Sequence, residues 1–246
     1  MFWFKFYRDP KDSRYINQAE MEYIRQGGGL AETAGTVKTL NLAHLRHLFN
    51  HRQLWGIYIG QFANTSTLFF FLTWFPTYLV SAKHMQFLKA GFLGSIPYIA
   101  AFLGVIFSGY LSDRMLRRGF STGASRKTPI ITGLLLACAI ILANYTTSTS
   151  MIITIMSVAF FAQGMSAISW TLVSDIAPSE LVGLAGGVFN FMGNLAGIVT
   201  PLVVGIIVNA THSFSGALVF ISVVALIGAL SYIFIAGKIQ RIEINE

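Results

Sequence analysis

Six long apolar stretches, separated by short polar segments, dominate this chain of 246 residues. Lys89, near the start of the second stretch, is the one charged residue within them. Each meets the roughly 17 to 25 residues that a helix needs to cross a bilayer, and the longer ones can tilt. The sequence therefore predicts an all-α membrane protein of six transmembrane helices, at Trp55–Val80, Leu88–Leu111, Pro129–Thr147, Met151–Val173, Val182–Asn209 and Gly216–Ala236.

The positions of the basic residues predict orientation. A net charge of +7 is compatible with nucleic-acid binding, but fifteen of the 17 Lys and Arg residues lie before the first stretch, between the second and third, or in the tail. The remaining two, Lys83 and Lys89, lie around the connection between the first and second stretches, with Lys89 at the very start of the second. This alternation follows the positive-inside rule, so we expect a lipid bilayer and not a nucleic acid as partner, with both termini in the cytoplasm.

The polar segments predict four parts of the chain. In the connector, Asn17 and Glu20 have the spacing of a capping box, and Gly27–Gly29 are expected to end that helix. Leu42–Leu54 is expected to form an amphipathic helix at the membrane surface. The parts are the end of a preceding span (1–6), a cytoplasmic connector with short amphipathic helices (7–53), a six-helix transmembrane domain (54–238) and a cytoplasmic tail (239–246).

Metal, cofactor and catalytic signals are weak. His44, His47 and His51 lack a nearby cysteine or carboxylate ligand, whereas structural zinc sites normally close with four ligands. Cys138 is the sole cysteine, which excludes an intramolecular disulfide. The H-E-x-x-H and G-x-S-x-G patterns of hydrolases do not occur. We therefore expect no metal site, no cofactor and no enzymatic activity.

Uncharged polar residues lie within the apolar stretches, whereas every Asp and Glu lies outside their interiors. Proton relays in membranes normally need an ionisable side chain at depth, so coupling is either absent or placed on another segment. The polar side chains either join helices, at about 0.6 kcal/mol each, or line a cavity for a hydroxylated solute. We favour the cavity for Gln61 and Asn190, while Trp170 fits an aromatic belt equally well. The candidate residues are Gln61, Asn64, Thr65, Ser169, Trp170 and Asn190.

Small residues are concentrated in the fifth stretch, where two pairs have the spacing G-x-x-x-G. This spacing lets helix backbones approach closely, so helix packing is the default interpretation and helix mobility is the alternative. The residues are Gly183, Gly186, Gly187, Gly193, Ala196 and Gly197.

The strongest local motif runs from Gly109 to Arg118, at the end of the second stretch. Its glycine permits close helix contact, and Asp113 can accept hydrogen bonds at the start of a neighbouring helix, where the dipole favours an anion. A basic anchor loop would explain Arg114, Arg117 and Arg118. It would not explain Gly109 and Asp113. The segment resembles the G-x-L-[AS]-D-R-x-x-R-[RK] gating loop of the major facilitator superfamily, which implies one half of a twelve-helix fold.

Further segments are similar to the anion:cation symporter family, particularly its bacterial carriers of galactonate and glucarate. The resemblance covers essentially the whole chain but only the second half of a family member. It implies that Gln61, Ser169, Trp170 and Asn190 contact the solute, and that the proton-binding carboxylates and the anion-binding arginine belong to the first half. The segments are Trp55–Gly56, Phe71–Leu79, Arg126–Pro129, Gly186–Phe191 and Tyr23–Gly29.

This resemblance implies proton-coupled uptake of a sugar acid by alternating access across the bacterial inner membrane. The partners would be the organic anion, protons and an N-terminal six-helix half. The alternatives are a truncated remnant without transport activity and a six-helix membrane scaffold.

Overall fold

The computed structural model describes residues 6, 8, 13, 15–26, 42–83 and 85–242, and every regular element among them is a helix. An apolar solvent offers no hydrogen bonds to the backbone, so helices, which satisfy their own N–H and C=O groups, are the expected outcome. The chain divides into two compact units, Met1–His44 and Leu45–Glu246.

The first unit contains α2 (Gln18–Gln26). The Glu20 amide donates to Asn17 Oδ1 at 2.8 Å, which confirms Asn17 as the helix cap. The predicted helix end at Gly27–Gly29 and the predicted span end at residues 1–5 lie outside the described residues.

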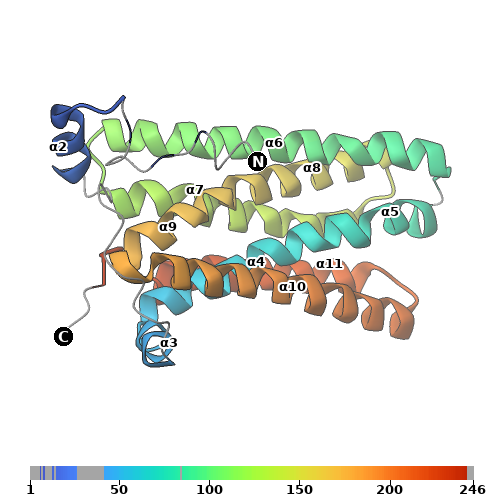
Figure 1. The fold of residues 1–246 in the computed structure, drawn as a ribbon. Coiled ribbons are helices and arrows are strands. Elements are labelled where there is room, and N and C mark those ends of the chain that lie inside the picture. Colours follow the sequence, from blue (N-terminus) through green and yellow to red (C-terminus); the bar gives the residue numbers. More distant parts are fainter. Residues whose placement is uncertain are drawn as a thin grey trace. The chain divides into compact units, whose positions relative to one another are not determined.

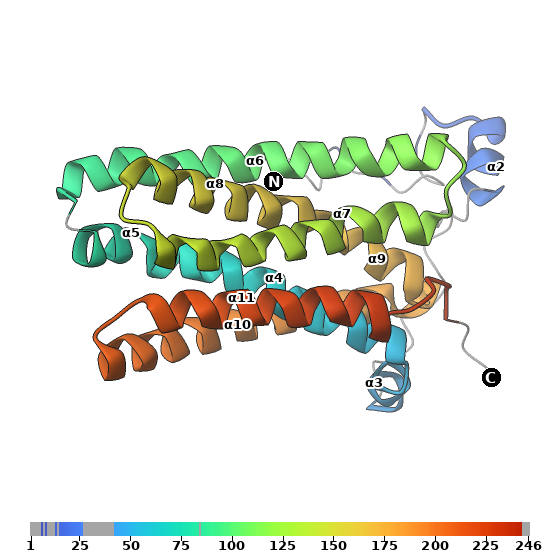
Figure 2. The same cartoon turned by 180° about the vertical axis from the view of Figure 1, so that it is seen from behind.

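The second unit contains long helices joined by short connections (Figure 1, Figure 2). Several spans change helix type along their length: α4 passes through α5 into a π-helical turn, α7 ends in a 3-10 segment, and a 3-10 turn joins α8 to α9. The helices are α3 (Leu42–Phe49), α4 (Arg52–Thr73), α5 (Phe75–Thr77), α6 (Phe87–Arg117), α7 (Thr122–Ala137), α8 (Thr149–Met165), α9 (Ser169–Ile176), α10 (Val182–Thr211) and α11 (Ser215–Leu230). The linking helical segments are Tyr78–Ala82, Cys138–Tyr145, Ser166–Ile168, Ser179–Leu181 and Ser231–Ile235.

Five of the described segments are long and apolar enough to cross a membrane. They are Phe87–Arg117, Thr122–Tyr145, Thr149–Ile176, Ser179–Thr211 and Ser215–Ile235. The remaining predicted span, Trp55–Val80, corresponds to α4, whose 22 residues extend about 33 Å and pack against α10 and α11. Its apolar sequence is interrupted by Gln61, Asn64 and Thr65. The structure thus agrees with an all-α membrane domain of six spans.

Three predicted boundaries are wrong. The third span begins at Thr122 and not at Pro129, because Ser121 Oγ accepts the Ala124 amide and caps the helix seven residues earlier. The second span continues to Arg117, so most of the motif at its end is helical. Leu42–Leu54 is not one helix, since the chain leaves the helical conformation between Phe49 and Arg52. The Trp55 indole closes this break by donating to the Phe49 carbonyl at 2.8 Å.

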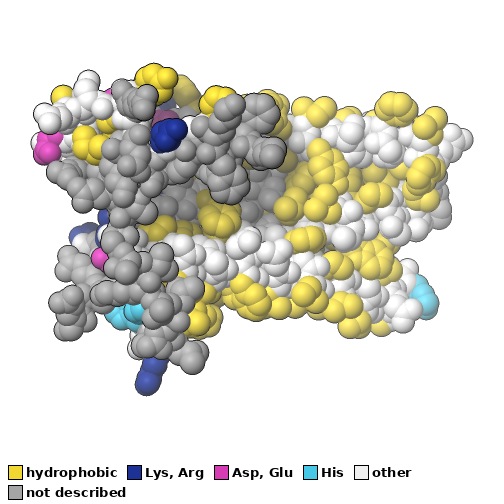
Figure 3. All heavy atoms as spheres, in the orientation of Figure 1, with side chains coloured by type: hydrophobic (Ala, Val, Ile, Leu, Met, Phe, Trp, Pro, Cys, Tyr) yellow, Lys and Arg dark blue, Asp and Glu magenta, His cyan; other side chains and the backbone are white. Residues whose placement is uncertain are grey.

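The core of the second unit consists of two main apolar clusters, one toward each end of the bundle. Phe71 of α4 stacks on Phe160 of α8 in the first cluster, with ring centroids 4.1 Å apart. Leu172 and Phe189 belong to the second cluster. In contrast, only 17% of the most apolar part of α6 is buried inside the domain, and only 22% of the most apolar part of the span that contains α10. Figure 3 shows hydrophobic side chains exposed along α10, so these two helices offer most of their surface to lipid or to another protein.

Close helix contacts depend on glycines, but not on the one in the motif. A Cβ on Gly104 of α6 would overlap the Phe161 carbonyl of α8, and a Cβ on Gly164 would overlap the Ala101 carbonyl in return. Gly109 has open space where its Cβ would be, within the described part of the chain. The predicted close contact at Gly109 is therefore not formed inside this domain.

Candidate functional site

The candidate site is centred on Gln61 of α4, where three helices meet. Ser169 Oγ, at the start of α9, donates to Gln61 Oε1 at 3.4 Å. A Cβ on Gly193 of α10 would lie 3.1 Å from Gln61 Nε2 and 3.2 Å from Thr65 Oγ1. Gln61 and Ser169 are buried, whereas Thr65 is half-buried. The predicted residues Gln61, Thr65 and Ser169 are thus brought together, and Gly193 makes the room for them.

Asn64 lies one helical turn from Gln61 and is only 7% exposed. Its Oδ1 atom is buried and has no hydrogen-bond partner among the described residues. A buried amide oxygen without a partner costs roughly 1–3 kcal/mol, so it favours a bound water or a solute group nearby. Among the predicted site residues, Asn64 is the one with a buried acceptor that no described donor satisfies.

Two predicted site residues lie on the exposed surface of this domain. Asn190 of α10 is exposed, and its Oδ1 accepts from Asn194 Nδ2 at 3.3 Å. Trp170 is 48% exposed and packs edge-on against Phe189, with ring centroids 4.9 Å apart. Both residues are therefore exposed in this domain, whereas Gln61 and Ser169 are buried. The other predicted role of polar residues, a hydrogen bond between helices, is observed at Ser166. Its hydroxyl donates to the Ile130 carbonyl at 3.4 Å.

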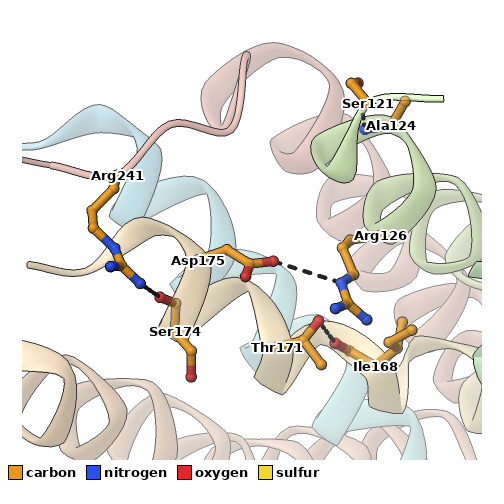
Figure 4. A network of polar contacts seen from close by, with 8 residues as sticks. All are labelled: Ser121, Ala124, Arg126, Ile168, Thr171, Ser174, Asp175 and Arg241. Carbon is orange, nitrogen blue, oxygen red and sulfur yellow. Dashed lines mark hydrogen bonds and ion pairs between the residues drawn. The ribbon is translucent and has the colours of Figure 1, made fainter. Parts of the chain in front are cut away.

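An ion pair that the sequence analysis missed lies at one end of the bundle. Arg126 Nε of α7 is 3.6 Å from Asp175 Oδ2 of α9. Figure 4 shows Arg126 and Arg241 approaching the end of α9 from opposite sides, with Arg241 donating to the Ser174 carbonyl at 3.0 Å. The sequence held a signal for this pair, because Arg126 precedes the third predicted span and Asp175 follows the fourth. Both ends lie on the same predicted side of the membrane. These contacts tie α7, α9 and the tail together.

The gating motif has one internal contact in this domain. Arg114 Nη1 donates to Tyr110 Oη at 2.6 Å, and both residues lie on the last turns of α6. Asp113, Arg117 and Arg118 are exposed. Asp113 forms no ion pair or hydrogen bond with any described residue, so the predicted contact with a helix start is not made among them.

His44 and His47 of α3, with His51 just before α4, do not form a group of metal ligands. His47 Nε2 and His51 Nε2 are 3.3 Å apart, within hydrogen-bond distance of each other. Burial, and then the nearby His47, lower the pKa of His51 from its ordinary value. No group of three or more potential metal ligands occurs among the described residues.

Comparison with known proteins decides the family. Residues 1–201 match the profile of the Major Facilitator Superfamily. The chain belongs to this superfamily. Its six spans therefore correspond to one half of a major facilitator.

Named relatives are carriers of sugar acids. The chain is 50% identical over 247 residues to the D-galactonate transporter of Escherichia coli O6:H1, which covers 98% of this chain and 57% of that protein. It is 43% identical over 250 residues to the probable galactarate/D-glucarate transporter GudP of Bacillus subtilis, covering 100% of this chain and 55% of that protein. The chain thus spans little more than half the length of these major facilitator relatives.

Proposed function

We propose that this chain is the C-terminal half of a secondary active transporter that carries a sugar acid, of the galactonate or glucarate type, by alternating access. The single observation that carries the proposal is the cluster of uncharged polar side chains around Gln61, which brings buried amides and a buried hydroxyl together. Amides and hydroxyls that both donate and accept hydrogen bonds suit a polyhydroxylated solute. The names of the relatives support a sugar acid as that solute.

In this proposal the site is shared between two halves. Gln61 and Asn190 hydrogen-bond the hydroxyls of the solute, and Ser169 holds the Gln61 amide in place. Asn64 supplies an acceptor, while Thr65 and Trp170 line the wall. None of these side chains is charged, so the group that binds the carboxylate belongs to the other half.

The transport is coupled to protons in the same proposal. Asp113, Asp175 and Glu180, the carboxylates between the first and last spans, lie near helix ends. A carboxylate that takes up and releases a proton at depth must therefore lie in the N-terminal half. The domain sits in the bacterial inner membrane with both termini in the cytoplasm, an orientation supported by the distribution of Lys and Arg.

Uptake by a two-part carrier tests the function. The chain is co-expressed in membrane vesicles with the N-terminal half of the Escherichia coli D-galactonate transporter, and uptake of labelled galactonate is followed under an imposed pH gradient. We expect accumulation with both halves and none with either half alone. Accumulation by this chain alone would contradict the proposal, as would correct assembly of both halves without uptake.

Reporter fusions test the orientation separately. Fusions at Glu246 and at Lys83 should report opposite sides, with the cytoplasmic signal at Glu246. A periplasmic signal at Glu246, or a cytoplasmic one at Lys83, would overturn the orientation without affecting the argument about the solute.

A further inference from the structure

A pocket lies at the end of the bundle where the chain leaves the last span. It is separate from the proposed solute site. It has a volume of about 610 Å³ and lies between the start of α4 and the residues that follow α11. Its lining includes His51, Arg52, Gln53, Lys238 and Arg241. The pocket is therefore lined by three permanent cations and no carboxylate among the described residues.

The walls of this pocket are fixed by bonds to backbone carbonyls. Arg52 donates from Nε to the Ile235 carbonyl at 3.1 Å and from Nη2 to the Phe234 carbonyl at 3.0 Å. Gln53 Nε2 donates to the Lys238 carbonyl at 2.7 Å. Carbonyl oxygens orient the Arg52 guanidinium without neutralising its charge, and these two bonds use Nε and Nη2, which leaves Nη1 available for another acceptor.

The tail completes the pocket from the opposite side. Arg241 Nη2 donates to the Ser174 carbonyl at 3.0 Å, and the Ile242 amide donates to the Ile176 carbonyl at 2.8 Å. Lys127 Nζ donates to the Gly237 carbonyl at 2.7 Å. Lys238 is exposed, and its Nζ forms no hydrogen bond or ion pair with a described residue.

The charge around the pocket is strongly unbalanced. Arg126 and Lys127 lie beside it, which raises the local count to five cations. Asp175 is the carboxylate in contact with this group among the described residues, and it is already paired with Arg126 at 3.6 Å. Asp175 also attracts Arg241, so one carboxylate faces five cations. Cations that are held close together by neutral carbonyls repel one another, and an anion in the pocket would relieve the repulsion that remains.

We infer that this pocket is a binding site for a phosphate-bearing anion, held by Arg52, Lys238 and Arg241. Arginine forks match the oxygens of a phosphate, and an exposed lysine adds a point charge. The pocket lies at the ends of the first and last spans, where phospholipid headgroups border a bilayer, and basic pockets at such positions bind anionic headgroups. A lipid phosphodiester and free phosphate share the required chemistry.

Lipid and phosphate binding by the full chain in neutral detergent tests this site. Native mass spectrometry measures retention of phosphatidylglycerol against phosphatidylcholine, and calorimetry measures binding of inorganic phosphate. Lys238→Gln with Arg241→Gln should weaken binding about tenfold. Arg117→Gln with Arg118→Gln removes two charges from the end of α6 and should change binding about twofold or less.

Lys238→Gln alone keeps the experiment interpretable, because its side chain holds no described element in place. Melting curves verify that each variant is folded. Selective loss of phosphatidylglycerol supports a lipid headgroup as the ligand, and selective loss of inorganic phosphate supports a soluble anion. The inference is overturned if the unsubstituted chain binds neither, if folded Lys238 and Arg241 variants bind as tightly as it does, or if the control pair loses as much.

Discussion

Two helix pairs in this domain use glycine in different ways. Between α6 and α8, Gly104 faces the Phe161 carbonyl and Gly164 faces the Ala101 carbonyl, so backbone meets backbone in both directions. Between α4 and α10, Gly193 faces the side chains of Gln61 and Thr65. The first contact leaves no space for a side chain, whereas the second makes space for an amide and a hydroxyl.

This difference separates a structural contact from a candidate recognition site. A reciprocal backbone contact tolerates almost no change in helix separation, because carbonyl oxygens cannot move independently of their helices. A glycine opposite a flexible polar side chain lets that side chain reorient toward a ligand. We therefore expect substitutions in the α6–α8 pair to alter stability or rate, and substitutions in the α4–α10 pair to alter affinity.

The largest effect is expected for Gly104→Ala. The added Cβ would force α6 away from α8, which should lower the free energy of unfolding by about 3 kcal/mol. Gly91→Ala is a matched control on the same helix, since its Cβ would meet no described atom within 4 Å. Melting curves of the purified chain measure both. If the two variants melt alike, the reciprocal contact does not hold the helices together.

The next largest effect is expected for Gln61→Ala and Asn190→Ala in the two-part carrier. Each should weaken solute binding by about 2 kcal/mol, because a polar group of the solute loses its partner. Asn209→Ala removes a comparable amide from the far end of α10 and should leave affinity unchanged. Calorimetry and melting curves are run together. Lower melting temperature with full affinity would mean that these amides only join helices.

A smaller effect is expected for Gly193→Ala. Its Cβ would press on Gln61 Nε2 from 3.1 Å, which a small rotation of the amide can relieve. The change should weaken solute binding by about 1 kcal/mol, while the gain in helix propensity offsets the loss of stability. Affinity is again measured by calorimetry. A loss of stability as large as that of Gly104→Ala would remove the distinction between the two helix pairs.

The smallest effect is expected for Asp113→Asn, at the exposed end of α6. If Asp113 meets a helix start in the other half, its charge contributes about 0.3–1 kcal/mol to one conformation of the carrier. Transport should slow about two- to fivefold with little change in affinity. Flux and binding are measured on the same vesicles, with protein level as control. Equal losses in both would assign Asp113 to the solute site.

The sequence predicted the spans because hydropathy reflects the solvent around a helix directly. It misplaced the start of the third span, because the cap at Ser121 is a local feature that the apolar stretch does not include. It also did not identify Gly104 and Gly164, since the contacting atoms are carbonyl oxygens of another helix. Such contacts depend on how each helix is rotated about its axis. A helix that is apolar on all faces has no sequence pattern that specifies this rotation.

The candidate site was predicted in part for a related reason. Gln61, Asn64 and Thr65 stand at positions i, i+3 and i+4, a spacing that predicts one shared helix face. The spacing could not indicate which neighbour that face meets. The structure brings Ser169 to Gln61 and places Asn190 on the exposed surface. The tail contacts of Arg52 and Gln53 had no sequence signal, because their acceptors are backbone carbonyls.

The bond from Ser231 Oγ to the Gly56 carbonyl joins positions 175 residues apart, near the two ends of the transmembrane domain. Within this domain α4 is made before the other spans, whereas its partners α10 and α11 are made last. At about 5–20 residues per second, this delay is on the order of ten seconds or more. For that period the buried amides of α4 lack their final neighbours. The contacts of α4 with α10 and α11 therefore form only after the last two spans of this domain have been translated.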